Sequence, residues 1–481
     1  METEEKKTGG QLLAEELLVN KKSCWEGIGA EEREKLDRFA GDYKQFLDAG
    51  KTEREFTAES QKVLEARGFK DLDALMEAGK PLAPGTAVYR NNRGKSIIFA
   101  VTGKKPAASG VNILGAHIDS PRLDLKNNPL YEDGEMAIFD THYYGGIKKY
   151  QWLSVPLALH GVFIRPDGKK IELRIGEDPS DPVLVITDLL PHLAQEQMQK
   201  KASELFSGED LDALAGSIPY PEKELKERVK LNLLKLLHDA YGIVEQDFAG
   251  AELELVPAAK ARDVGLDRSM IGGYGHDDRC CAYTALRAVL EFAGKQPPKT
   301  VIGYLSDKEE IGSYGNTGAA ARFFENFIAD LASLGAGTCA GYQLHRLLEQ
   351  SCMLSADVGA AFDPRFADVY DKKGSPYLGK GLSLTKYTGA RGKFGGSDAN
   401  AEFYNKVIRI LDARKLPWQF GDLGRVDQGG GGTIALYAAQ LGIEVLDCGI
   451  AVLSMHSPFE VISKIDLYTT YQAYLAFLED A

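Results

Sequence analysis

The stretch VIGYLSDKEEIGSYGNTGA (residues 301–319) carries a strand-like run into two adjacent glutamates and a glycine-rich turn. Residues 301–305 are apolar, which is typical of a strand buried in a sheet. Glu309 and Glu310 follow soon after that strand ends, although adjacent like charges repel. The two glutamates either belong to an ordinary solvated loop or have different roles in one site.

The segments on both sides of this stretch alternate between strand and helix patterns. Apolar runs of strand length occupy residues 96–103 and 111–119. After Gly265, helical patterns at 279–294, 398–415 and 466–480 alternate with strand patterns at 299–306, 351–357 and 443–456. Such alternation predicts an α/β fold with a mostly parallel central sheet flanked by helices.

The region between residues 123 and 262 has a different pattern. Strand-like pieces at 156–168 and 169–176 alternate with turn signals, and a charged helix is expected at 221–242. We therefore expect a β-rich domain of residues 123–262, inserted into a discontinuous domain of residues 1–122 and 263–481.

The composition limits the partners and the compartment. The chain has 481 residues, with 70 acidic against 57 basic side chains and a net charge of -13. This balance argues against nucleic acid or an anionic membrane as the main partner. The six cysteines are scattered without a CxxC pair, and the charged start METEEKKTGG is unlike a secretory signal. No apolar run reaches the roughly 20 residues of a membrane span, so we expect a cytoplasmic protein with reduced thiols.

Ionisable residues stand at the ends of five strands of the predicted sheet, at the edge that usually faces a ligand. Two histidines with several carboxylates, and no thiolate at matching positions, form a ligand set for one or two Zn²⁺ or similar ions. Taken singly, each residue is more simply a cap or a turn residue. The chain contains no HExxH, GxSxG or phosphate-loop motif. The residues concerned are His117 and Asp119; His276, Asp277 and Asp278; Asp307, Glu309 and Glu310; Asp357; and His456.

Six motifs together resemble one family of enzymes. They are LGAHIDSPRL, GYGHDDR, SDKEEIGSYGNTGA, LSADVGAAFDP, GGGGTIA and VLSMHSPFE. In this order and spacing they are similar to the zinc metallo-aminopeptidases that include aspartyl aminopeptidase and vacuolar aminopeptidase I, from about Phe46 to the C-terminus. The resemblance implies a two-metal site in an α/β catalytic domain that is interrupted by a dimerisation domain. This agrees with the insertion expected from the sequence pattern.

The resemblance also implies a metal-binding role for five residues. Asp277 would bridge two divalent ions, which would be zinc, with cobalt or manganese as alternatives. His117 and Asp357 would complete the site of one ion, and Glu310 and His456 that of the other. Within the pair at 277–278, it is the second residue that varies from the family pattern.

Three further residues receive roles from the resemblance. Glu309 would be the general base that takes a proton from a metal-activated water, and Asp119 would orient His117. His192, in the inserted segment DLLPHLA, would reach the active site of a neighbouring subunit and stabilise the carbonyl oxygen. The alternative for His192 is a surface-turn histidine. The segment HYYGG (residues 142–146) departs from the family pattern and receives no role.

The implied activity is hydrolysis of the N-terminal residue from peptides with a free N-terminus, by homodimers that assemble into a homododecamer. An amidase or deacylase on the same two-metal fold is one alternative, and a non-catalytic assembly protein is another. The preferred N-terminal residue, acidic or neutral, stays open at this stage. A basic side chain in the pocket would favour an acidic residue, and the candidates are Lys380, Lys386, Arg391 and Lys393.

Overall fold

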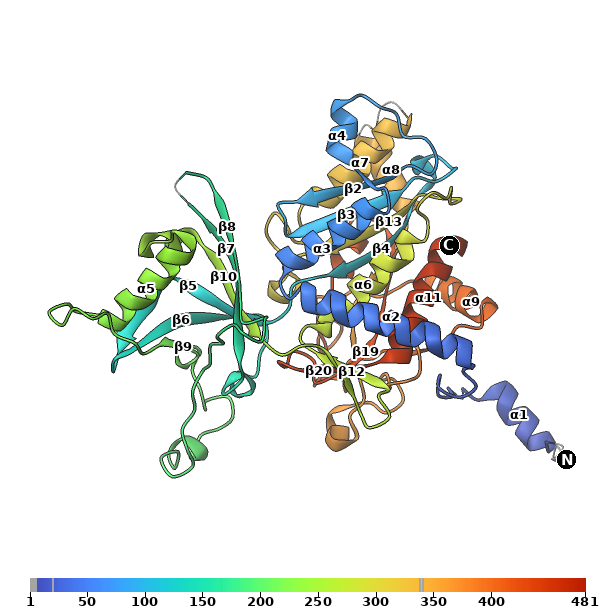
Figure 1. Ribbon diagram of the computed structural model, residues 1–481. Helices are drawn as coiled ribbons and strands as arrows, with labels where there is room; N and C mark the ends of the chain where they lie inside the picture. The colour runs from blue at the N-terminus through green and yellow to red at the C-terminus, as the bar shows by residue number, and fades with distance from the viewer. Residues whose placement is uncertain (1–6, 20, 166, 337–338, 340) are drawn as a thin grey trace.

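The computed structural model describes residues 7–19, 21–165, 167–336, 339 and 341–481. Its body is built on a nine-stranded mixed sheet, beside which a six-stranded antiparallel sheet forms a separate unit (Figure 1). The strands of the nine-stranded sheet, in order across it, are β1 (Lys70–Asp71), β2 (Ala87–Asn92), β3 (Ser96–Val101), β13 (Val301–Ser306), β4 (Asn112–His117), β14 (Cys352–Ala356), β18 (Glu444–Gly449), β16 (Leu382–Thr385) and β17 (Trp418–Phe420).

The centre of this sheet is parallel. Strands β13, β4, β14 and β18 all run in the same direction, whereas β3 and β16 pair antiparallel with their inner neighbours. The predicted α/β fold with a mostly parallel central sheet is therefore confirmed. Because parallel strands share their direction, the segments that follow β13, β4 and β14 leave the sheet at the same edge.

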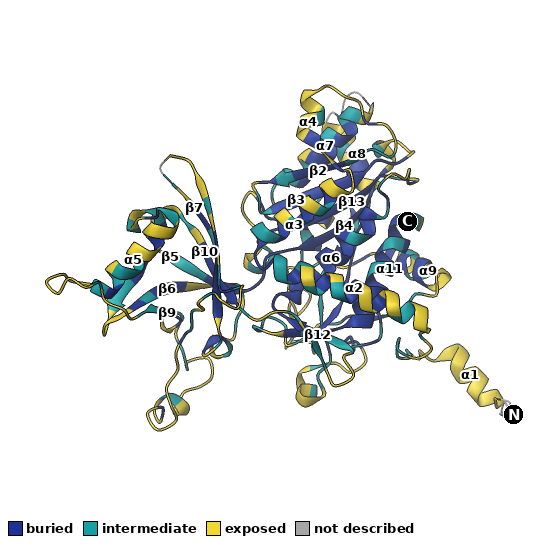
Figure 2. Cartoon of the chain, in the orientation of Figure 1, coloured by how far each residue is buried: buried dark blue, intermediate teal, exposed yellow. Residues whose placement is uncertain are grey.

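Helices cover both faces of the sheet and create two cores. In β3, Ile97 and Phe99 belong to one core and Ile98 and Ala100 to the other, because successive side chains of a strand point to opposite faces. Figure 2 shows the strands buried between helices whose outer faces are exposed. The first core contains α2 (Ala30–Ala49), α3 (Glu53–Ala66), α6 (His276–Leu290), α9 (Ala401–Ala413) and α11 (Lys464–Asp480). The second contains α4 (Leu72–Glu77), α7 (Phe323–Ala336), α8 (Gly341–Glu349) and α10 (Ala435–Gln440).

The N-terminal helix α1 (Gly9–Leu17) projects from the body and has no buried residue (Figure 2). Among the described residues, none of the helices combines the length and the apolar character that crossing a membrane requires.

A five-stranded sheet lies below the main one in Figure 1. Its strands, in order, are β11 (Arg262–Val264), β12 (Met270–Gly273), β20 (Glu460–Ser463), β19 (Ala451–Leu453) and β15 (Gly359–Ala360). The prediction of a single strand at 443–456 was wrong, because the chain passes from β18 to β19 and so changes sheets. The change occurs after Gly449, where a side chain would meet the Asp357 carbonyl oxygen at 1.9 Å. Both pieces are largely buried and are joined without a turn signal, so periodicity does not reveal the break.

The six-stranded sheet has its own core, which includes Trp152, Phe163 and Phe248. Its strands, in order, are β8 (Lys170–Ile175), β7 (Leu157–Ile164), β10 (Glu252–Pro257), β5 (Arg122–Asp133), β6 (Met136–Tyr144) and β9 (Ala213–Gly216).

One helix, α5 (Arg228–Tyr241), contacts strands of this sheet and starts later than the predicted 221–242. The Glu132 carboxylate accepts the backbone N–H groups of Val229 and Lys230, which satisfies the first donors of the helix. This capping residue comes from β5, far along the chain, so the local sequence does not reveal where the helix begins.

Candidate metal centre

Three parallel strands bring acidic and histidine side chains to one edge of the main sheet. His117 is the last residue of β4, and Asp357 directly follows β14. Glu309 and Glu310 lie in the turn after β13. Their proximity follows from the parallel pairing of β4 with both neighbours.

The remaining two groups come from the smaller sheet. Asp277 lies in the first turn of α6, soon after β12, and His456 lies between β19 and β20. The prediction that all five strand ends belong to one sheet was therefore wrong. The smaller sheet reaches the same edge because β18 of the main sheet continues directly into β19.

Asp277 stands between the two histidines. Its Oδ1 is 3.2 Å from Nε2 of His117, and its Oδ2 is 3.2 Å from Nε2 of His456. Nε2 of His456 is also 3.5 Å from Oε1 of Glu310. The possible ligand atoms of His117, Asp277 and Glu310 all lie within 4.8 Å of one another. One carboxylate thus faces two separate imidazole nitrogens, each accompanied by further oxygen atoms.

A second group of possible ligand atoms joins His117 to Asp357 and Asp278, again within 4.8 Å of one another. Asp278 is fully buried, and its Oδ2 accepts the backbone N–H of His117 at 3.3 Å. Among the described residues, it is Asp277 and not Asp278 that pairs with His456. The geometry therefore favours Asp277 over Asp278 as the carboxylate shared by both halves of the cluster.

The cluster contains more carboxylates than its histidines can neutralise. Burial raises the pKa of Glu310 and of Asp357 well above the ordinary range, and the nearby Asp277 charge raises both further. Burial also raises the pKa of Glu309 to about 7. For His456, burial lowers the pKa, but the Asp277 hydrogen bond and the Glu310 charge more than offset this and raise it to about 10. Such an excess of buried negative charge is what cations would offset.

The residues present fit divalent cations. Oε1 of Glu310 is buried and has no hydrogen-bond partner among the described residues. The donors are imidazole nitrogens and carboxylate oxygens, which suit Zn²⁺ and similar ions. Another possible ligand group, Asp278 with Cys280 and Cys281, lies close by. Burial raises the pKa of Cys281 well above its ordinary value, so that thiol stays protonated and is a poor ligand.

Asp119 holds two segments of the cluster in place through hydrogen bonds. Its Oδ1 accepts the backbone N–H of Glu309 at 3.1 Å, and its Oδ2 accepts that of Glu310 at 3.1 Å. Nδ1 of His117 donates to the Asp119 carbonyl oxygen at 3.0 Å, which leaves Nε2 directed at Asp277. This is the arrangement expected of a residue that orients a metal-binding histidine.

Sequence reasoning missed three groups next to the cluster. Glu460 accepts the backbone N–H of Asp277 at 3.0 Å and that of His456 at 2.7 Å. The Tyr144 hydroxyl donates to Oδ2 of Asp119 at 2.8 Å, and the Gly146 carbonyl accepts from Nδ1 of His456 at 2.7 Å. An acid directly before the apolar pair Val461–Ile462 was a weak signal for Glu460, whereas nothing in the local sequence indicates the other two.

Three other candidates lie apart from the cluster. His276 is buried against Tyr43, whose Oη is 2.7 Å from Nδ1 of the histidine, and burial lowers its pKa to about 3. Asp307 accepts the Thr317 hydroxyl at 2.6 Å and pairs with its neighbour Lys308. His192 is exposed in a turn of the inserted region and does not line the pocket at the cluster.

A pocket of about 320 Å³ opens onto the cluster. The four glycines of residues 429–432 line its wall together with Arg391 and Lys393. Lys393 pairs with Asp398 at 2.8 Å, whereas Arg391 forms no ion pair among the described residues. Of the other two basic candidates, Lys380 donates to the Lys21 carbonyl and Lys386 pairs with Asp398, and neither lines the pocket.

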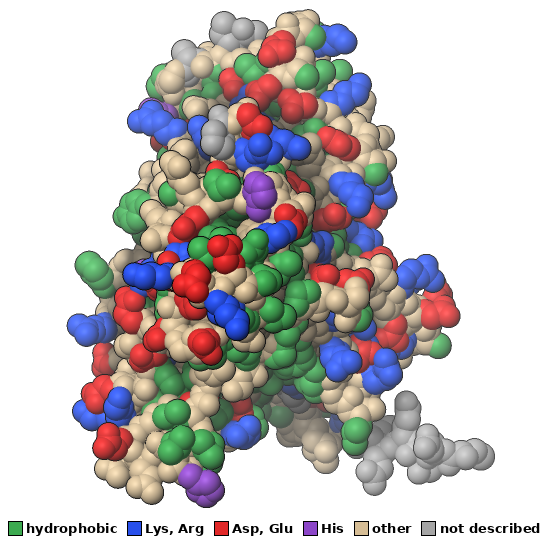
Figure 3. All heavy atoms as spheres, turned by 60° about the vertical axis from the view of Figure 1, so that its left-hand side comes forward, with side chains coloured by type: hydrophobic (Ala, Val, Ile, Leu, Met, Phe, Trp, Pro, Cys, Tyr) green, Lys and Arg blue, Asp and Glu red, His purple; other side chains and the backbone are tan. Residues whose placement is uncertain are grey.

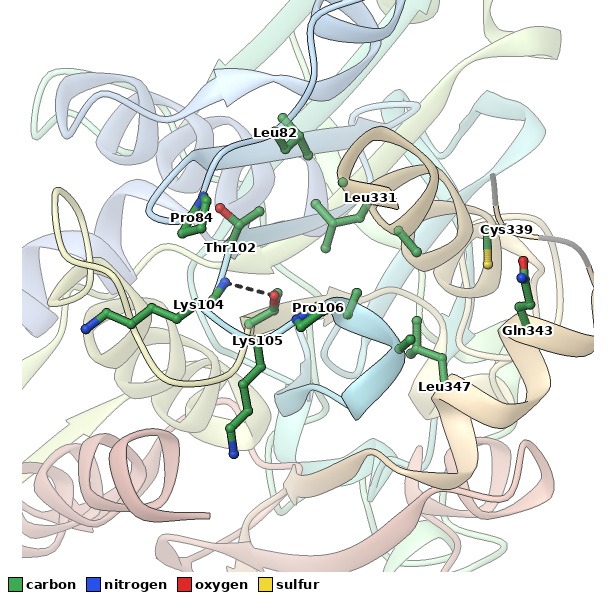
Figure 4. A pocket seen from close by; sticks show the side chains of 16 residues that line it. Leu82, Pro84, Thr102, Lys104, Lys105, Pro106, Leu331, Cys339, Gln343 and Leu347 are labelled. Carbon is green, nitrogen blue, oxygen red and sulfur yellow. Dashed lines mark hydrogen bonds between the residues drawn. The ribbon is translucent and has the colours of Figure 1, made fainter. Parts of the chain in front are cut away.

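A second cavity, of about 280 Å³, lies at the opposite edge of the main sheet (Figure 4). Thr102, which follows β3, and Thr300, which precedes β13, form part of its wall. Leu331 and Leu347 contribute apolar surface, and Lys104 stands at its margin (Figure 4). It contains none of the predicted site residues, all of which lie outside this cavity.

An α/β sheet that presents histidines and carboxylates at the carboxyl ends of its strands is an arrangement typical of metal-dependent enzymes, hydrolases among them. The model of the family described as "Aminopeptidase I zinc metalloprotease (M18)" matches residues 46–478. The "Probable M18 family aminopeptidase 1" of Clostridium acetobutylicum is 50% identical over 471 residues, which cover 97% of this chain and 100% of that relative. The chain therefore belongs to the M18 family and is an aminopeptidase that carries out metal-dependent hydrolysis at the N-terminus of peptides.

Solved structures agree with this assignment. The crystal structure of an M18 family aminopeptidase from Thermotoga maritima matches with a TM-score of 0.91 and 46% identity, over 96% of this chain and 100% of that one. The dodecamer of mApe1 from Saccharomyces cerevisiae shares the fold, with a TM-score of 0.71 and 20% identity, over 92% of this chain and 97% of that one.

Proposed function

We propose that the aminopeptidase holds two divalent cations, with zinc as the preferred metal, through five residues of the cluster. They are His117, Asp277, Glu310, Asp357 and His456. Asp277 would give one oxygen to each cation, with His117 and Asp357 on one side and Glu310 and His456 on the other. The observation that carries this proposal is the position of Asp277, whose two oxygens each lie 3.2 Å from a different histidine Nε2. When bound, such cations polarise the scissile carbonyl and lower the pKa of a water molecule.

We further propose that Glu309 is the general base. Its Oε2 is 3.9 Å from Nε2 of His117, and its side chain faces the pocket. A carboxylate in this position can accept a proton from the attacking water and return it to the leaving amine. The Glu309 side chain fits this role better than Glu310, whose Oε1 faces His456.

The substrates would be peptides with a free N-terminus, because the carboxylates of the cluster attract an α-ammonium group. We infer that Arg391, which lines the pocket without an ion pair among the described residues, favours an acidic N-terminal residue. A panel of aminoacyl substrates with Asp, Glu, Ala and Leu tests this. Arg391→Gln should lower kcat/KM for the acidic members only, and an equal loss for all four would remove Arg391 from recognition.

The metal assignment is tested by counting ions per chain. Asp277→Ala should bind neither ion tightly, whereas Arg391→Gln should keep the wild-type content.

A peptide with a blocked α-amine should resist the wild-type enzyme. Its hydrolysis would favour an amidase instead, and a wild-type content of one ion would overturn the two-metal assignment.

We also propose that residues 123–262 form a dimerisation domain within a cytoplasmic homododecamer. The six-stranded sheet has its own core, and the yeast relative was solved as a dodecamer. In Figure 3, where this unit comes forward, hydrophobic side chains are exposed among charged ones. The large exposed apolar side chains between β8 and α5 are Val183, Leu189, Leu190, Leu193, Met198, Ile218 and Leu225. Light scattering of the purified enzyme measures the assembly, and a stable monomer would rule it out.

His192 lies in the same exposed segment, and we propose that it completes the site of a neighbouring subunit. His192→Ala and Glu309→Gln should each be inactive alone. The two variants are then dissociated and reassembled as a mixture. In a mixed pair, the His192→Ala subunit keeps its own Glu309 and receives an intact His192 from its Glu309→Gln neighbour. Recovered activity in the mixture supports the proposal, and its absence in verified mixed oligomers contradicts it.

A further inference from the structure

The main chain at residues 144–146 leaves the six-stranded sheet and passes along the metal centre. Tyr144 is the last residue of β6 and is paired across the sheet with Arg122 of β5. The Arg122 guanidinium lies over the Tyr144 ring, 3.9 Å from its centroid, and is itself buried beside Glu53. A cation–π contact therefore holds the ring against Arg122, and the ion pair of Arg122 with Glu53 of α3 links this part of the sheet to the body.

The first contact of this segment is a hydrogen bond to Asp119. The Tyr144 hydroxyl donates to Oδ2 of Asp119 at 2.8 Å. The same oxygen accepts the backbone N–H of Glu310, and the other carboxylate oxygen accepts that of Glu309. The hydroxyl thus fixes the orientation of the carboxylate that holds both glutamates.

The second contact is made by the backbone alone. The Gly146 carbonyl can only accept, so Nδ1 of His456 is the donor of their 2.7 Å hydrogen bond. This contact places the proton of a neutral imidazole on Nδ1, so Nε2, which is directed at Asp277 and Glu310, is the nitrogen left to bind a metal.

Gly145 explains how the segment can come so close. Its φ is +74°, and a side chain there would meet both Cβ and Oε2 of Glu310 at 3.3 Å. A glycine is the residue that permits this backbone conformation and this approach together. The segment therefore touches Asp119, Glu310 and His456 within three consecutive residues.

We propose that residues 144–146 are a positioning element of the metal centre, in which Tyr144 orients Asp119 and Gly146 orients His456. The inference rests on the proposed roles of Glu310 and His456 as ligands. It makes the six-stranded sheet a structural part of the site, in addition to any role in assembly. Neither Tyr144 nor Gly146 touches a reacting atom in this scheme.

The test compares Tyr144→Phe with Tyr143→Phe in the full-length enzyme. Tyr143 is the adjacent residue of β6, points to the opposite face and is 41% exposed, so its substitution is a matched control. Zinc affinity is measured in competition with a chelator, and the visible absorption spectrum is recorded for the cobalt-substituted proteins. Thermal unfolding of the metal-free proteins reports on folding.

Tyr144→Phe should lose about 10- to 100-fold in zinc affinity or in kcat, with an altered cobalt spectrum and an unchanged KM. Tyr143→Phe should match the wild type in each measurement. Wild-type zinc affinity and an unchanged cobalt spectrum in Tyr144→Phe would overturn the proposal.

Two further variants keep the result interpretable. Gly145→Ala adds a methyl group against Glu310 and should weaken zinc binding. It tests the proposal if Tyr144→Phe fails to fold, and wild-type zinc affinity in Gly145→Ala would then overturn the proposal. Glu310→Gln tests the ligand assignment on which it rests. If Glu310→Gln retains both ions, the ligand assignment fails. If Glu310→Gln loses one ion but Tyr144→Phe and Gly145→Ala keep wild-type zinc affinity, only the positioning role fails.

Discussion

The two histidines of the metal centre are held in different ways. His117 has a side chain only 2% exposed, and its Nδ1 donates to the Asp119 carbonyl of its own segment. The side chain of His456 is 34% exposed, and its Nδ1 donates to Gly146, 310 residues earlier in the chain. One half of the centre is thus fixed within the body, and the other depends on chain that arrives from the six-stranded sheet.

The largest effect on activity should come from Glu309→Gln. This variant should lose catalysis while both halves of the metal centre keep their ions. We expect kcat to fall by about 10²- to 10⁴-fold, because an amide cannot accept the proton. The metal content should equal that of the wild type, as measured by elemental analysis of the same preparation. Activity close to the wild-type level would remove Glu309 from the mechanism, and lost metal would make it a ligand.

Replacing each histidine by alanine tests the asymmetry directly. Each variant should lose about one of the two ions per chain. His117→Ala should also lose about 1–3 kcal/mol of unfolding free energy in the metal-free protein, because it leaves buried carboxylates without a partner. His456→Ala should lose less, since its side chain is partly exposed. Equal destabilisation in chemical denaturation would remove the distinction between the two halves.

Asp119→Asn should have an intermediate effect that reaches both halves. The amide replaces one of the two oxygens that accept from Glu309 and Glu310, so their turn is held less firmly. We expect a loss of about 10- to 100-fold in metal affinity or kcat. Chelator competition and steady-state kinetics measure it. A change confined to folding stability would mean that Asp119 only supports the turn.

The smallest effect concerns a junction that touches neither metal-binding histidine. His160 of β7 is buried, with Nδ1 2.8 Å from Glu55 in α3 and Nε2 3.1 Å from Glu177, which also pairs with Lys51 and Lys260. Burial lowers the His160 pKa, but the hydrogen bonds to Glu177 and Glu55 more than offset this and raise it above its ordinary value.

A raised histidine pKa contributes stability that is fully present below the unfolded-state pKa of about 6.5 and is lost as the pH rises through the folded-state pKa. His160→Gln should therefore destabilise the enzyme most under mildly acidic conditions and least under alkaline ones. Denaturant titrations at several pH values measure this, with metal content as the control. A difference that grows with pH would contradict the proposed charge state.

The sequence predicts the main sheet well because the signals for its strands lie within each strand's own segment. Apolar runs and glycine-bounded helices identify β3, β4, β13 and α6 directly, and a charged residue after a buried strand marks the edge of the sheet. The division between β18 and β19 escapes this reasoning, since both pieces are buried and only the close approach at Gly449 separates them.

The same limit applies to the site. The ionisable residues of the cluster were predictable as a set, because each ends or follows a strand and their side chains carry the chemistry. Tyr144, Gly146 and Glu460 were not, because they act through contacts between segments far apart in the chain. A carbonyl oxygen has no sequence signature at all.

The path of residues 144–146 has a consequence for modularity. A sheet with its own core usually invites the view that it can be excised to leave a minimal catalytic unit. Here excision would remove the acceptor for His456 and the hydroxyl that orients Asp119. If the proposed positioning role holds, a shortened active enzyme has to keep both sheets, and the projecting helix α1, which has no buried residue, is the better place to begin.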